Sequence, residues 1–190
     1  MVHILEEYAK NNNIPIMQKD GIEFLTNYIK ENNIKSILEI GSAIGYSAIK
    51  MTLVDNDIHV TTIERDIERY NLAKENINKF NLNNQINIIN ADALDINIEG
   101  YFDLIFIDAA KSQYIKFFEK YKNNLNSKGV IISDNLSFHG LVEDISKTNN
   151  RNTIQLVKKI KKYIDFLKSN DEFKTKFISI GDGIAITQRK

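Results

Sequence analysis

The chain has 190 residues, of which 43% are hydrophobic and 26% are charged, and its 25 basic and 25 acidic side chains cancel. This length predicts a single domain over residues 1–190, with N-terminal helices in 1–34 and a core in 35–190. The absence of cysteine excludes disulfides, thiolate metal sites and a cysteine nucleophile. Zero net charge gives no electrostatic support for a nucleic-acid partner.

The sequence also lacks the features of membrane and secreted proteins. No apolar run approaches the roughly 18–20 residues that span a bilayer. Residues 1–7 show no basic region followed by an apolar stretch, as a secretion signal would. We therefore expect a cytoplasmic protein with no membrane partner.

The first elements are two amphipathic helices, predicted at residues 2–10 and Lys19–Glu31 and separated by the only proline, Pro15. Strands and helices then alternate, with Asp66 expected to cap a helix. Strands are predicted at Ser36–Ile40, 58–63, 86–89, 104–107 and 130–132, and helices at 46–54, 66–80, 111–125 and 153–168. This alternation indicates an α/β protein with a parallel sheet and helices on both faces.

The C-terminal part breaks the alternation. Two β-like runs, 173–180 and 184–187, flank Gly181-Asp182-Gly183, and Asp-Gly between such runs is a hairpin signal. The sequence therefore predicts a mostly parallel sheet of seven strands that ends in an antiparallel hairpin.

A glycine-containing turn, Gly41 to Gly45, follows the first strand and lets backbone N–H groups approach a ligand. It is neither a GxGxxG nor a Walker loop. Glu64 ends the second strand, where an acidic side chain can accept from ribose hydroxyls, and Asp92-Ala93 follows the third, where it could meet an adenine edge. Such a turn suits S-adenosylmethionine better than NAD, although a tight turn with solvated carboxylates is the simpler alternative.

Two acids and an amide follow later strands. Asp108 comes directly after one apolar run and Asp134-Asn135 closely follows another, so they can offer three oxygens to a hard cation such as Mg²⁺. Lys111 opens a predicted helix, where its charge opposes the helix dipole. A turn or helix cap at Asp134 and a surface role for Lys111 are the structural alternatives.

Four segments, 38–47, 62–64, 107–111 and 133–135, together resemble those of the cation-dependent O-methyltransferases, which include catechol and caffeoyl-CoA O-methyltransferases. The resemblance runs from about Met17 to the C-terminus and implies a Rossmann-like methyltransferase fold and a homodimer. It implies that Asp108, Asp134 and Asn135 bind Mg²⁺ and that Lys111 is the catalytic base. It further implies that S-adenosylmethionine is held by Met17, Glu39, Gly41, Ser47, Glu64, Asp92, Ala93 and Asp108.

The same resemblance bears on the methyl acceptor. Residues 150–154 and 181–186 are most similar to a bacterial branch that converts 5-hydroxyuridine at the tRNA wobble position to 5-methoxyuridine. Ala109 stands where the catechol enzymes carry a histidine, and the chain lacks the N-terminal extension of the plant enzymes. The expected acceptor is therefore the tRNA anticodon loop, with Arg151 and His139 as candidate substrate contacts.

Two alternatives stay open. A catechol and 5-hydroxyuridine both offer two neighbouring oxygens to a metal, so a small catechol-like phenol would serve the same site. A nucleoside-binding module without catalysis is the other alternative. Four lysines of one helix could contact phosphates, but they are also typical of a solvated helix face: Lys158, Lys159, Lys161 and Lys162.

Overall fold

The computed structural model describes residues 2–190 and contains one seven-stranded sheet in the order β3-β2-β1-β4-β5-β7-β6. Strands β1 to β5 pair in parallel, and β7 runs antiparallel to both β5 and β6. The predicted fold class is confirmed. The strands are β1 (Ser36–Ile40), β2 (His59–Glu64), β3 (Ile86–Asn90), β4 (Phe102–Ile107), β5 (Leu125–Ser133), β6 (Phe173–Ile178) and β7 (Ile184–Arg189).

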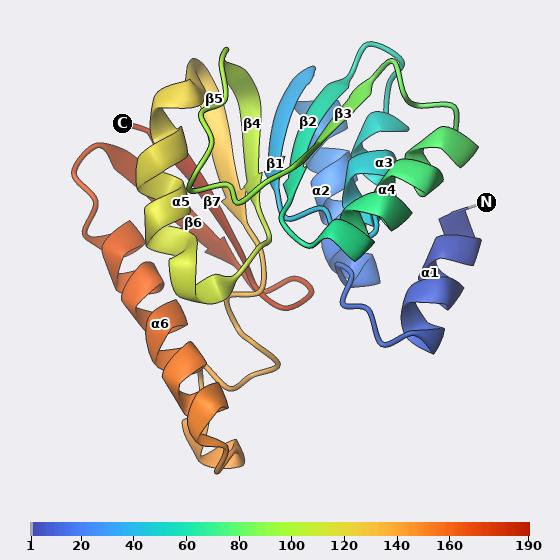
Figure 1. Cartoon of the computed structure of the whole chain (residues 1–190). Coiled ribbons are helices and arrows are strands. Elements are labelled where there is room, and N and C mark those ends of the chain that lie inside the picture. Colours follow the sequence, from blue (N-terminus) through green and yellow to red (C-terminus); the bar gives the residue numbers. More distant parts are fainter. Residues whose placement is uncertain (1) are drawn as a thin grey trace.

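Helices cover both faces of this sheet (Figure 1). They are α1 (Val2–Asn11), α2 (Lys19–Glu31), α3 (Tyr46–Thr52), α4 (Ile67–Lys79), α5 (Tyr114–Tyr121) and α6 (Arg151–Lys168). Because strand side chains alternate, β4 sends Leu104 and Phe106 into the core under α1 to α4, and Ile105 and Ile107 into the core under α5 and α6. The apolar runs read from the sequence are thus buried on both sides.

The region between β4 and β5 differs from the prediction of one helix over residues 111–125. A 3₁₀ turn (Lys111–Gln113) precedes α5, another (Lys122–Asn124) follows it, and Leu125 already belongs to β5. Strand β5 starts five residues earlier than the predicted 130–132, because the polar stretch 126–129 does not read as a strand. A register shift against β4 lies in this part of the pairing.

The other boundaries shift by a few residues. The loop of the C-terminal hairpin covers residues 179–183, and is therefore longer than a two-residue Asp-Gly turn. Asn150 caps α6 by accepting from the backbone N–H groups of Asn152 and Thr153, so the helix begins at Arg151 rather than at residue 153. Asp66 caps α4 as predicted, accepting from Glu68 and Arg69.

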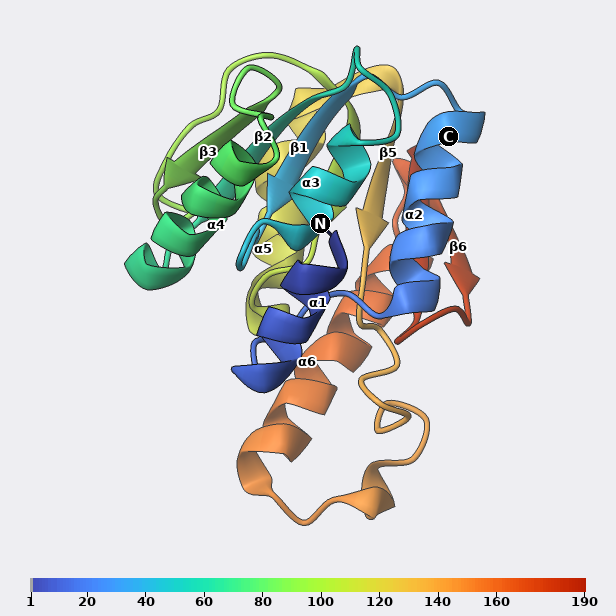
Figure 2. The ribbon, with the colours of Figure 1, turned by 90° about the vertical axis from the view of Figure 1, so that its right-hand side faces the viewer.

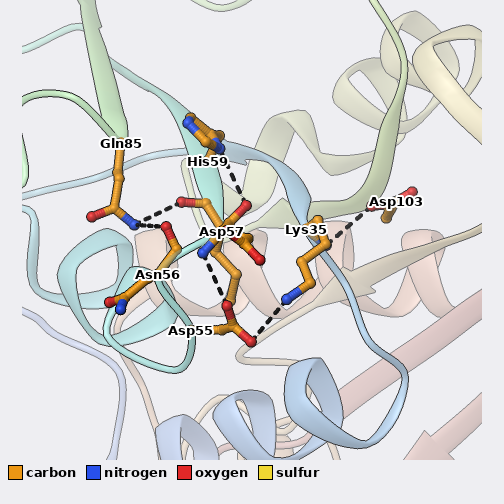
Figure 3. A network of polar contacts seen from close by, with 8 residues as sticks. Lys35, Asp55, Asn56, Asp57, His59, Gln85 and Asp103 are labelled. Atoms are coloured by element: carbon orange, nitrogen blue, oxygen red, sulfur yellow. Dashed lines mark hydrogen bonds and ion pairs between the residues drawn. The ribbon is translucent and has the colours of Figure 1, made fainter.

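A polar network fixes the edge of the sheet where the parallel strands begin (Figure 3). The Lys35 ammonium lies 2.8 Å from the Asp55 carboxylate, and the Lys35 backbone N–H donates to Asp103. Gln85 donates to the carbonyl of Asn56 across 2.9 Å. These contacts join the segments before β1, β2 and β3 to one another and to β4.

At the opposite edge of the sheet, the loop after β5 and the first turns of α6 extend beyond the strands (Figure 2). Among residues 2–190, no helix is long and apolar enough to cross a bilayer.

Candidate functional site

A cavity of about 290 Å³ opens at the carboxyl ends of β1, β2 and β4. This is the edge where open α/β sheets bind ligands. The cavity brings together most of the predicted site: Met17, Gly41, Ser47, Glu64, Asp92, Ala93, Asp108, Lys111 and Asn135. Four predicted residues do not line it: Glu39, Asp134, His139 and Arg151.

Gly41 makes the close crossing of the β1 turn and the end of β4 possible. Its φ is +95°, and a Cβ atom there would lie 2.6 Å from the backbone oxygen of Asp108. Its N–H donates to the carbonyl of Ile63 at 2.9 Å. Only glycine fits this backbone without displacing the chain that carries Asp108.

The Glu64 carboxylate braces the same turn from β2. One of its oxygens accepts from the Ala43 N–H and the other from the Asp66 N–H, each at 2.9 Å. Glu64 also lines the cavity, and each of its oxygens can accept a further hydrogen bond. Its predicted contact with ribose hydroxyls stays a prediction.

Glu39 is fully buried beneath the turn. Ser47 and Thr62 donate hydroxyl hydrogen bonds to its two oxygens. Burial raises the pKa of Glu39 to about 7, a shift that these hydrogen bonds oppose and the charge of Glu64 reinforces. Glu39 does not line the cavity, and its hydrogen bond from Ser47 links it to the lining.

Asp92 and Ala93 form the wall beyond β3. Asp92 accepts from the Leu94 N–H at 2.9 Å, and its other oxygen lies 3.8 Å from the Arg65 guanidinium. The carbonyl of Ala93 accepts from the Tyr121 hydroxyl at 2.6 Å. The backbone of this wall is therefore fixed by α5.

The acids after β4 and β5 converge on one amide. The side-chain nitrogen of Asn135 lies 2.9 Å from an oxygen of Asp108 and 3.0 Å from an oxygen of Asp134. Burial raises the pKa of both carboxyl groups, and the charge of Asp134 raises that of Asp108 further. The other Asp134 oxygen is buried without a hydrogen-bond partner. A buried carboxylate with an orphaned oxygen, beside the half-buried carboxylate of Asp108, forms an environment that favours a cation.

No group of three or more His, Cys, Asp or Glu side chains within residues 2–190 is placed to hold a metal ion. A cation between Asp108 and Asp134 would thus need Asn135 as its third ligand. The amide nitrogen of Asn135 faces the carboxylates in this structure, and its oxygen would have to turn toward them.

Lys111 lines the cavity close to these carboxylates. Its positive charge lowers the pKa values of both Asp108 and Asp134, and its amine lies 5.9 Å from the centre of the Phe138 ring. Lys111 begins a 3₁₀ turn, not the α-helix that was predicted, so the helix-dipole argument for it does not apply.

The candidate substrate contacts lie elsewhere. Arg151 is the exposed first residue of α6, and the four predicted lysines of α6 are exposed along the helix. The His139 ring lies 3.7 Å from the buried carboxylate of Asp182. Asp182 is the residue that the sequence reading missed, because an Asp-Gly pair is usually an exposed turn.

Comparisons with known proteins identify the family of this chain. The model of a family described as O-methyltransferase matches residues 1–190. A Staphylococcus aureus crystal structure, provisionally described as a caffeoyl-CoA O-methyltransferase, has a TM-score of 0.94 and 40% identity, covering 100% of this chain and 92% of that one. A caffeoyl-CoA O-methyltransferase of Populus kitakamiensis is 28% identical over 97% of this chain and 82% of its own length.

A third relative supports the fold. The O-methyltransferase from Bacillus cereus, solved in complex with SAH, has a TM-score of 0.84 and 24% identity, with 100% of this chain and 90% of that one covered. The family match spans the whole chain, and the cavity lies where this fold binds its ligand. The chain therefore belongs to the O-methyltransferase family and is an S-adenosylmethionine-dependent O-methyltransferase.

Proposed function

We propose that this enzyme uses a divalent cation, held by Asp108, Asp134 and Asn135, to methylate an acceptor with two neighbouring oxygens. The observation that carries this proposal is the convergence of two carboxylates, the buried Asp134 and the half-buried Asp108, on Asn135 within 3.0 Å and beside Lys111. A catechol-like phenol is the acceptor class that we favour.

S-adenosylmethionine would occupy the cavity at the carboxyl ends of β1, β2 and β4. The Gly41 turn lines this space, and carboxylates at the ends of the next two strands, Glu64 and Asp92, are available for its ribose and adenine. The residues proposed to contact it are Met17, Gly41, Ser47, Glu64, Asp92, Ala93 and Asp108, with Glu39 acting through Ser47.

Mg²⁺ suits the donor set because it prefers oxygen ligands and commonly keeps positions for water or substrate. The orphaned oxygen of Asp134 and the repulsion between Asp134 and Asp108 both support a cation there. When bound, such an ion would lower the pKa of an acceptor hydroxyl and orient it.

Lys111, in its neutral amine form, is proposed to accept the proton of that hydroxyl and to become the ammonium. The acceptor oxygen forms a bond to the methyl carbon of the sulfonium, the carbon–sulfur bond breaks, and its electron pair stays on sulfur. The products are the methyl ether and S-adenosylhomocysteine, and the proton stays on the Lys111 amine. Lys111 is on the cavity wall that also holds Asn135, as this role requires.

The choice of acceptor rests on the relatives and on two side-chain positions. The Populus relative is named for caffeoyl-CoA, and a caffeoyl group carries two adjacent phenol hydroxyls. Two residues that favoured tRNA in the sequence support it less in the structure. Asn150 caps α6, and Arg151 does not line the cavity. The tRNA wobble base therefore becomes the second candidate.

One assay separates these candidates. The protein is incubated with methyl-labelled S-adenosylmethionine and either a panel of catechols or tRNA that carries 5-hydroxyuridine, with and without EDTA. We expect transfer to a catechol that EDTA abolishes and Mg²⁺ restores. Transfer only to tRNA would replace the acceptor class, and transfer insensitive to EDTA would reject the metal. Binding of S-adenosylmethionine without any transfer would favour the nucleoside-binding module.

The homodimer implied by the family resemblance is also a proposal. Sedimentation velocity at several protein concentrations tests it, and a single species with the mass of one 21.9 kDa chain would reject it. Cytoplasmic location stays a prediction, to be tested by cell fractionation.

A further inference from the structure

The segment that follows the proposed metal ligands has an unusual backbone. Phe138, His139 and Gly140 have φ values of +48°, +58° and +76°, and Asn135 has a φ of +64°. Two consecutive non-glycine residues in the left-handed region are unfavourable, because their Cβ atoms crowd the following carbonyl oxygens. Such a backbone persists only where surrounding contacts hold it.

The turn between β6 and β7 supplies those contacts. The N–H of Leu136 donates to the carbonyl of Gly183 at 2.9 Å, and the N–H of Ser137 donates to the carbonyl of Asp182 at 2.7 Å. The approach is close, since a Cβ atom at Gly183 would lie 2.8 Å from the Ser137 nitrogen. The two segments are therefore clamped together by their backbones.

The Asp182 side chain extends this clamp to the left-handed residues. One of its carboxylate oxygens accepts from the His139 N–H at 2.5 Å. The side chain is only 5% exposed, and its other oxygen has no hydrogen-bond partner. Burying a carboxylate costs free energy unless it makes strong contacts, and a hairpin turn can form without a buried acid. The burial of Asp182 therefore points to a role in holding the neighbouring segment.

The clamped segment places the Phe138 ring near Lys111, the proposed base. Phe138 lies between the two residues whose N–H groups Asp182 holds, and its ring centre is 5.9 Å from the Lys111 amine. Asn135, at the start of the segment, is the residue on which Asp108 and Asp134 converge. The position of the segment therefore sets one wall of the space beside Lys111.

We propose that Asp182 is a positioning residue for the methyl acceptor. It does not touch the cofactor cavity. It fixes residues 138–140 in their left-handed backbone and so holds the Phe138 ring near Lys111 on the acceptor side. This inference rests on the proposed function, because it assumes that the acceptor reacts beside Lys111.

The test compares Asp182→Ala with Asp182→Asn. Alanine removes the acceptor for the His139 N–H, whereas the asparagine side-chain oxygen can still accept that hydrogen bond. Asp144→Ala is the matched control. Asp144 is an exposed acid in the same connection, and its side chain accepts from the Ser146 N–H.

Three quantities are measured for each variant. Amide hydrogen exchange of a peptide covering residues 135–142 reports the order of the segment. Calorimetry gives the Kd of S-adenosylhomocysteine. Steady-state kinetics use whichever acceptor the wild type methylates, catechol or tRNA.

We expect Asp182→Ala to speed exchange of this peptide and to lower kcat/KM for the acceptor about tenfold or more, since small misplacements near reacting groups are costly. The Kd of S-adenosylhomocysteine should stay at the wild-type value. Asp182→Asn should recover most of both losses, and Asp144→Ala should resemble the wild type.

Other outcomes overturn the inference. Unchanged exchange in Asp182→Ala means that Asp182 does not hold the segment. Faster exchange with unchanged acceptor kinetics means that the segment does not position the acceptor. Equal loss of acceptor turnover and S-adenosylhomocysteine binding indicates general damage, as does an Asp182→Asn variant as impaired as alanine. If the wild type methylates neither acceptor, the proposed function fails, and the exchange result alone decides whether Asp182 holds the segment.

Discussion

The phenol hydroxyl of Tyr114 donates a hydrogen bond of 3.1 Å to the backbone carbonyl of Asp134, and both groups are buried. This contact joins the first residue of α5 to the proposed metal ligand after β5. In Tyr114→Phe the carbonyl loses its donor, which should cost about 1–2 kcal/mol of unfolding free energy. Because the backbone of Asp134 is then less fixed, we expect Mn²⁺ to bind about tenfold more weakly in a titration followed by electron paramagnetic resonance.

Tyr163→Phe is the control for that variant. Tyr163 packs edge-on against Tyr114, and its hydroxyl is 2.7 Å from the Ser133 hydroxyl, one residue before Asp134. It should lose similar stability in urea while keeping its Mn²⁺ affinity. If both variants lose metal binding equally, the Tyr114 contact has no special role.

Lys111→Ala tests the proposed base. We expect kcat to fall by about 100-fold or more, as is usual when a general base is removed, while the Kd of S-adenosylhomocysteine stays nearly the same. Lys116→Ala removes an exposed lysine from α5 and should have wild-type kinetics. A parallel loss of turnover and cofactor binding in Lys111→Ala would contradict its role as base.

Gly41→Ala and Gly100→Ala separate backbone conformation from close packing. Both glycines have φ values near +95°, but a Cβ atom at Gly100 meets nothing within 4 Å, whereas one at Gly41 lies 2.6 Å from the Asp108 oxygen. Gly100→Ala should therefore cost only about 1–2 kcal/mol of conformational energy. Gly41→Ala should be less stable than this in urea and should lose S-adenosylhomocysteine binding by calorimetry. Equal stability of the two variants would argue against the crossing of β1 and β4 described above.

The buried carboxyl group of Glu39 predicts how the stability of the protein depends on pH. Burial raises its pKa from 4.5 to about 7, so between these values the folded protein holds a proton that the unfolded chain releases. The contribution of Glu39 to stability therefore falls as pH rises from 5 to 7.5, by roughly 2 kcal/mol. Glu39→Gln removes this dependence.

Unfolding in urea at pH 5 and pH 7.5 measures the effect. The free energy of unfolding of Glu39→Gln, relative to that of the wild type, should be higher at pH 7.5 than at pH 5. A difference that is the same at both pH values would mean that Glu39 titrates normally in the folded protein. The charges of Glu64 and Asp108 act on Glu39, and both the wild type and Glu39→Gln keep these two residues.

The sequence predicts the strands and the loops after them well, because buried parallel strands are short apolar runs and ligand residues follow their carboxyl ends. It places Asp108, Asp134 and Asn135 together for this reason. It does not predict that the polar stretch 126–129 belongs to β5, because β pairing there depends on neighbouring strands rather than on side-chain pattern. The N-cap at Asn150 makes Arg151 the first, exposed residue of α6. The sequence motif at 150–154 does not show that this position lies outside the cavity.

Contacts between distant segments are the other part that sequence reasoning misses. The Tyr46 hydroxyl donates to Glu6 of α1 at 2.7 Å, which ties the first helix to the turn beside the cofactor cavity. Asp182 reaches the segment after β5 in the same way. Neither pair has a spacing that a local pattern could show, since both depend on the completed sheet.

The clamp between residues 136–139 and the turn at 181–183 has a consequence for the order in which the protein assembles. Strand β5 and Asn135 are synthesised before α6, β6 and the turn that contains Asp182. Until those later residues leave the ribosome, the segment after Asn135 has only its own local hydrogen bonds and lacks the contacts to Asp182 and Gly183. The segments from β1 to β4, which supply most of the cavity lining, can form early from local strand–helix units, whereas the segment proposed to position the acceptor waits for a long-range contact. A nascent chain should therefore be able to bind S-adenosylmethionine before it can methylate anything.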